Sequence, residues 1–161
     1  MAHNDQEKNP LEGLWKLLSF SIQDESADKQ YPLGHDPIGY VNYLPNKFMM
    51  MHMGMRNRPR VAADSPLDLQ LSNALLEMVK TYVGYCGTYE IQGNHVYHHI
   101  DLAFFPNWTG QSVEREFKID NNFLKLTDRL IVAGQKYIFD AHWEKVKTIV
   151  AIASGIDDLL F

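Results

Sequence analysis

The order of apolar and polar residues predicts a series of short β-strands interrupted once by a helix. We predict strands over residues 14–23, 39–44, 47–56, 85–92, 95–104, 112–119, 123–127 and 136–146. Turn-forming dipeptides such as Pro45-Asn46 and Gly93-Asn94 separate several of them. Short strands joined by tight turns are typical of an up-and-down antiparallel meander, and about eight of them can close into a barrel around one small ligand.

Residues 65–83 follow a helical period instead. Apolar residues recur there three or four positions apart: Leu67, Leu71, Ala74, Leu75, Met78, Val79 and Tyr82. This spacing predicts an amphipathic helix. Ser65 suits the N-cap, Pro66 the first helical position and Gly84 the stop. We expect the helix to cap or flank the barrel, with its apolar stripe in the core.

Length and composition predict one mainly β domain over residues 1–161, with residues 1–11 as a flexible arm. Hydrophobic residues make up 45% and charged residues 22%, a balance typical of a folded globular chain. The net charge is −5 and the basic residues are scattered, which argues against a nucleic-acid partner. The lone Cys86, the polar N-terminus and the lack of a long apolar run predict a cytoplasmic protein without a membrane partner.

Several motifs in this order are similar to those of the bacterial and fungal lipocalin-like domain family, a branch of the calycins. Gly13-Leu14-Trp15 resembles the G-x-W that opens a lipocalin barrel, and residues 39–53 resemble the family's glycine, tyrosine and methionine-rich segment. Residues 82–117 resemble its Y-x-G-T-Y-E, V-x-H, P-N-x-x-G and R-x-F series. Trp143-Glu144-Lys145 resembles its ending.

The resemblance implies a barrel with an internal pocket, in a family that contains both binding proteins and a few enzymes without cofactors. One position departs from the lipocalin pattern. Lys145 stands near the place of the arginine that packs on the opening tryptophan. We therefore expect the contact that closes the barrel to be weak or absent.

Strand alternation indicates which side chains point inward. On residues 95–104, the more apolar face carries Val96, His98, Ile100 and Leu102, so this face is assigned to the interior. By the same alternation, the other strands contribute inward side chains from Tyr85, Tyr89, Ile91, Val113, Arg115, Phe117 and Ile119.

The predicted catalytic group is His98, Tyr89 and Arg115. Together they offer a proton donor or acceptor, a phenol and a fixed positive charge, which suit a carboxylate, enolate or carbonyl oxygen. A structural alternative stays open: Arg115 pairs with a carboxylate at the barrel mouth, while His98 and Tyr89 hydrogen-bond to each other.

The segment Met49-Met50-Met51-His52-Met53 suggests a pocket for irregular apolar shapes, because methionine is flexible and polarizable. Plain core packing is an equal alternative. His52 reaches the pocket only if the strand alternation is reversed, and Trp108 on its turn could gate an opening. The predicted ligand-binding residues are Tyr43, Met49, Met51, His52, Met53, Tyr85, Trp108 and Phe117.

No metal or cofactor is expected. His98 and His99 are adjacent and point to opposite faces of a strand, and no histidine, cysteine or carboxylate group has metal-ligand spacing. Phosphate-loop and dinucleotide motifs do not occur in the sequence.

The leading hypothesis is a protein that binds a small hydrophobic metabolite with a polar oxygen. It then catalyses isomerisation, cyclisation or elimination without a cofactor. One alternative is a binding or carrier protein without turnover. Another is a homodimer or larger scaffold that assembles through the apolar tail, residues 149–161.

Overall fold

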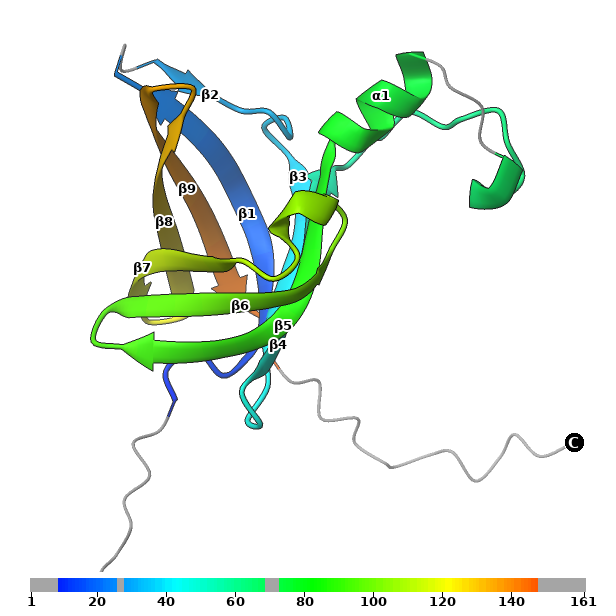
Figure 1. Cartoon of the computed structure of the whole chain (residues 1–161). Coiled ribbons are helices and arrows are strands. Elements are labelled where there is room, and N and C mark those ends of the chain that lie inside the picture. Colours follow the sequence, from blue (N-terminus) through cyan, green and yellow to red (C-terminus); the bar gives the residue numbers. More distant parts are fainter. Residues whose placement is uncertain (1–8, 26–27, 69–72, 148–161) are drawn as a thin grey trace, which may run out of the picture.

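The computed structural model describes residues 9–25, 28–68 and 73–147 (Figure 1). Within them, antiparallel strands form one sheet that closes on itself, because the first long strand also pairs with the last. The strands are β1 (Gly13–Asp24), β2 (Lys29–Gln30), β3 (Pro37–Tyr43), β4 (Phe48–Met55), β5 (Tyr82–Gln92), β6 (His95–Ala103), β7 (Ser112–Asp120), β8 (Phe123–Val132) and β9 (Gln135–Lys145). The two-residue β2 adds only to β1, so the other eight strands make the barrel. This confirms the predicted fold class.

The helix predicted over residues 65–83 is present in its described parts, but it is not buried. These parts are a short 3-10 turn, η1 (Pro66–Asp68), and α1 (Asn73–Lys80), while β5 begins at Tyr82, two residues before the predicted stop at Gly84. Ser65 does cap η1, since its Oγ accepts a hydrogen bond from the backbone N–H of Leu67 at 3.2 Å. Among the described residues, no helix is long and apolar enough to cross a membrane.

The apolar stripe of the helix does not enter the core. No residue of α1 is buried, and the stripe residues Leu67, in η1, and Val79 are 99% and 40% exposed. The strands already close the barrel on themselves, so they leave no open face of the sheet for a helix to cover. Figure 1 accordingly shows α1 projecting away from the strands.

The closed end of the barrel is built around Trp15. Its indole Nε1 donates a hydrogen bond to the Leu11 carbonyl at 2.7 Å, and Leu11 is fully buried. The Lys145 ammonium lies 4.3 Å from the centre of the Trp15 ring and donates to the Glu12 carbonyl. The closing contact is therefore present, as a cation–π contact made by a lysine, so it is not absent. The end of the expected flexible arm, from Asn9 to Leu11, belongs to the barrel; residues 1–8 lie outside the described residues.

A bulge in the β5–β6 pair decides which side chains of β6 reach the interior. Cys86 pairs with Leu102 but Gly87 pairs with Ile100, so one extra residue stands on β6. A bulge shifts the alternation by one. Leu102 therefore points out and is 66% exposed, which corrects its predicted inward position. The pairing requires glycine at position 87, because a Cβ there would lie 1.9 Å from the His99 carbonyl oxygen.

The barrel wall is incomplete between β7 and β8. Their ladder runs from the Asp120–Phe123 pair to the Glu116–Thr127 pair and ends there. Beyond it, residues 128–132 of β8 pair with β9 and residues 112–115 of β7 pair with β6. A surface hollow of about 360 Å³ lies in this split. The β8–β9 hairpin turns through Ala133 and Gly134, both with positive φ, and rises beyond β7 in Figure 1.

Candidate functional site

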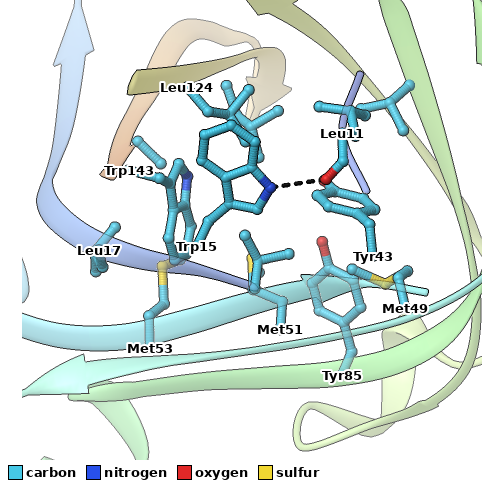
Figure 2. Close-up of a cluster of buried hydrophobic side chains, with 14 of the residues drawn as sticks. Leu11, Trp15, Leu17, Tyr43, Met49, Met51, Met53, Tyr85, Leu124 and Trp143 are labelled. Atoms are coloured by element: carbon cyan, nitrogen blue, oxygen red, sulfur yellow. Dashed lines mark hydrogen bonds between the residues drawn. The ribbon is translucent and has the colours of Figure 1, made fainter. Parts of the chain in front are cut away.

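The barrel interior holds a cavity of about 220 Å³ with mostly apolar walls. It is lined by Phe20, Ile22, Pro32, Leu33, Met51, Met53, Lys80, Val83, Trp108, Arg115, Leu126, Asp128, Leu130, Phe139, Ala141 and Trp143. Four residues of the predicted site are among them: Met51, Met53, Trp108 and Arg115. The bottom of the barrel is filled by packed aromatic, leucine and methionine side chains, shown in Figure 2.

A polar network lies within this apolar surround and is centred on His98. The imidazole Nε2 is 2.9 Å from the Tyr43 hydroxyl, and Nδ1 is 2.7 Å from the Tyr85 hydroxyl. Nη1 of Arg115 lies 2.7 Å from the same Nδ1 and also donates to the Tyr85 hydroxyl. Three strands, β3, β5 and β7, thus direct polar groups at one histidine of β6.

The arginine fixes the protonation of His98. A guanidinium can only donate hydrogen bonds, so Nδ1 must present its lone pair to Arg115. The proton of the neutral ring therefore sits on Nε2 and is donated to the Tyr43 hydroxyl. Burial lowers the pKa of His98 well below its ordinary value of 6.5, and the charge of Arg115 lowers it further. His98 is a neutral acceptor that holds the guanidinium in place.

Arg115 faces a carboxylate across the barrel split. Its Nη2 lies 3.7 Å from Oδ2 of Asp128, and the two side chains are only 16% and 9% exposed. Burial raises the pKa of Asp128, while Arg115 acts in the opposite direction. Burial alone would lower the pKa of Arg115, but Tyr85 and Asp128 outweigh it and the pKa is raised. The guanidinium therefore stays charged.

Sequence reasoning missed Asp128. The strand predicted over residues 123–127 ends one residue before Asp128, whereas β8 continues to Val132. Leu124, Leu126 and Asp128 alternate along β8 and are all buried, so a longer strand would have revealed the carboxylate by parity. Its presence supports one half of the structural alternative, in which Arg115 pairs with a carboxylate.

Tyr89 does not join this network. It is buried as predicted, but its hydroxyl donates to the Leu44 carbonyl at 2.9 Å and lies 2.5 Å from Nδ2 of Asn9. The other half of the structural alternative, a hydrogen bond between His98 and Tyr89, is not formed, because Tyr43 and Tyr85 occupy both ring nitrogens. A catalytic role for Tyr89 stays a prediction.

Other predicted ligand contacts lie outside the cavity lining. Met49 and Tyr43 are fully buried near the packed bottom, and Phe117 is half-buried against the core (Figure 2 labels the first two). His52 is on the outer face of β4, with Nδ1 2.5 Å from the Tyr82 hydroxyl. The reversed alternation that would bring it inside therefore does not occur.

Aromatic side chains mark one wall of the cavity. The Trp108 ring meets the Tyr85 ring edge-on at 6.4 Å between centres, so a ligand at Trp108 is adjacent to the polar network. Burial raises the pKa of Tyr85, against the effect of Arg115, which keeps the phenol uncharged at neutral pH.

The indole Nε1 of Trp143 is buried and has no hydrogen-bond partner in the described part of the chain. Residues 9–25, 28–68 and 73–147 contain no cluster of three metal-ligating side chains.

Comparison with protein families shows the family to which the chain belongs. The model of the lipocalin-like domain matches residues 12–147, which include every strand of the barrel and every residue of the polar network. The chain belongs to the lipocalin-like domain family. No curated protein matches its sequence. A lipocalin-like barrel suggests that the protein binds a small hydrophobic ligand. In this lipocalin-like domain Arg115 and Asp128 line the interior cavity.

Proposed function

We propose that this lipocalin-like domain binds a small, largely apolar molecule in its interior cavity and directs a polar oxygen of that molecule at Arg115. The observation that carries the proposal is a guanidinium fixed in a mostly apolar cavity of about 220 Å³. Burial of apolar ligand surface supplies affinity, at about 0.8 kcal/mol per CH₂ group. The guanidinium supplies orientation.

The geometry leaves Arg115 able to meet a ligand. Its Nη1 is occupied by Tyr85 and His98, which hold the planar group in one orientation. Nη2 is 3.7 Å from Asp128, beyond hydrogen-bond distance, so its N–H groups remain available for a ligand oxygen. A charged donor inside a low-dielectric cavity makes a stronger hydrogen bond than the same group in water.

Turnover is the second candidate, and the arrangement supports it less. Of the predicted catalytic residues His98, Tyr89 and Arg115, Arg115 alone lines the cavity. Both nitrogens of His98 are engaged by protein groups, so no ring atom is free to exchange a proton with a ligand. We therefore place binding without turnover ahead of isomerisation, cyclisation or elimination. Conversion of a bound ligand, monitored by mass spectrometry, would reverse that order.

The cellular location and the oligomeric state are two further predictions. The cytoplasmic location rests on the sequence arguments given above. The predicted homodimer would assemble through the tail, residues 149–161, which lies outside the described residues. Sedimentation of the full chain and of a chain ending at Lys147 tests the dimer, since loss of the tail should convert dimer to monomer.

Fluorescence of N-phenylnaphthylamine tests binding directly, because the dye brightens in apolar cavities. Naphthalene and naphthol should both displace the dye. Arg115→Met should lower the affinity for naphthol by about tenfold, which corresponds to one hydrogen bond to a charged group, and should leave the affinity for naphthalene unchanged. Arg129→Met is the matched control, since Arg129 is exposed and pairs with Glu116 on the surface. Equal affinities of the Arg115→Met variant and the unmodified protein for naphthol would contradict the proposal. If that variant does not fold, Arg115→Lys keeps the charge and removes the planar donor group.

A further inference from the structure

The charges that face the cavity determine which polar head a ligand can carry. Three charged side chains line it: Lys80, Arg115 and Asp128. The Lys80 ammonium is largely exposed and lies 3.6 Å from the Glu77 carboxylate, so solvent and its partner reduce its effect on the interior. The charges that act on a buried ligand are those of Arg115 and Asp128, which together sum to zero.

We propose, on the basis of the function proposed above, that Asp128 makes this cavity selective for uncharged ligands with a hydroxyl group and against carboxylates. A hydroxyl can accept a hydrogen bond from Nη2 of Arg115 and donate one to the Asp128 carboxylate. The two groups stand 3.7 Å apart, close enough for one small group to address both. A ligand carboxylate would instead place a second negative charge beside Asp128, with one guanidinium to compensate two anions.

The rest of the network offers an anion no further compensation. His98 is neutral and its Nε2 proton is already donated to Tyr43. The Tyr85 hydroxyl is engaged by both His98 and Arg115. A buried carboxylate would therefore meet no second positive charge and no additional free donor from these side chains, whereas a hydroxyl needs none.

Matched aromatic probes measure this selectivity. Naphthalene, naphthol and naphthoate, the last two substituted at the same position, share one ring system and compete with N-phenylnaphthylamine. In the unmodified protein naphthol should bind about tenfold or more tightly than naphthoate. Asp128→Asn leaves Arg115 uncompensated and should raise naphthoate affinity by about tenfold, with little change for naphthalene. The matched control is Glu116→Gln, which removes a carboxylate from the outer surface beside Arg129 and should change none of the affinities.

The double variant Arg115→Gln, Asp128→Asn separates charge from shape. It removes both buried charges, so the gain in naphthoate affinity expected for Asp128→Asn should disappear. The double variant also keeps the test valid if Asp128→Asn alone does not fold. Naphthoate that binds the unmodified protein as tightly as naphthol, or a gain that persists in the double variant, would overturn the selectivity but leave the binding function intact. If none of the three probes displaces the dye, the binding function itself fails.

Discussion

Replacing His98 with glutamine removes a titrating group from the interior and leaves an amide to contact Tyr43 and Tyr85. The pKa of His98 is depressed in the folded state by burial and by Arg115. Below its ordinary pKa of 6.5 the unfolded chain takes up a proton that the folded chain does not. The stability that this imidazole contributes is thus present above that pKa and is lost as the pH falls.

Linkage sets the size of the effect. A single site that binds a proton only in the unfolded state lowers the free energy of unfolding by about 1.4 kcal/mol between about pH 7.5 and about pH 5.5. The His98→Gln variant should lack this loss. At neutral pH the variant should itself be less stable by about 1–3 kcal/mol, because one amide cannot replace all the hydrogen bonds of the ring. Burial also lowers the pKa of His142, but that contribution is common to both proteins and cancels.

Urea unfolding followed by tryptophan fluorescence across this pH range measures the difference. His35→Gln serves as control, since His35 is an exposed loop residue that stacks on Tyr31 and is remote in sequence from the network. The control should keep the acid loss of the unmodified protein. If His98→Gln and the unmodified protein lose equal stability on acidification, His98 is not a neutral buried acceptor and the assignment of its proton to Nε2 is wrong.

Two further changes test the packing around the site, both by the free energy of unfolding. Gly87→Ala should lower the free energy of unfolding by about 3 kcal/mol or more, because the new methyl group meets backbone at the bulge. Gly93→Ala, in an open turn with φ +61°, should lower it by about 1 kcal/mol. Similar losses in the two variants would contradict the close approach at Gly87. Trp143→Phe should be about 1–2 kcal/mol less destabilising than Trp15→Phe, because the Trp143 N–H has no hydrogen bond to lose among the described residues, whereas the Trp15 N–H has one. A larger loss of stability in Trp143→Phe would show that its N–H is hydrogen-bonded.

The sequence was sufficient for those parts of the site that depend on local alternation. Parity alone predicts that His98, Tyr85 and Arg115 point inward, and all three meet in the structure. The partners that decide the chemistry are long-range. Tyr43 reaches His98 from a strand 55 residues earlier, and neither its distance nor its direction follows from local pattern.

Other features depend on the closed barrel as a whole. Leu102 follows the apolar face of its strand in sequence, yet the bulge opposite Gly87 turns it outward. The stripe that includes Leu67 and Val79 has helical spacing, yet both side chains are exposed, because a sheet that closes on itself leaves no apolar face for the stripe to cover. Amphipathic periodicity shows that a face could be buried; the tertiary structure determines whether it is.

The incomplete ladder between β7 and β8 bears on the rate at which a ligand can leave. Backbone hydrogen bonds join these strands only as far as the Glu116–Thr127 pair, and Asp128 is the next residue of β8. An outward movement of the β8–β9 hairpin tip would break no backbone hydrogen bond to β7. It would open the surface ion pair between Arg129 and Glu116 and separate Asp128 from Arg115. Amide exchange in residues 128–132 should then slow when a ligand bridges the two side chains. Ligand release can thus follow local opening on the time scale of hairpin motion, while the closed end around Trp15 stays folded.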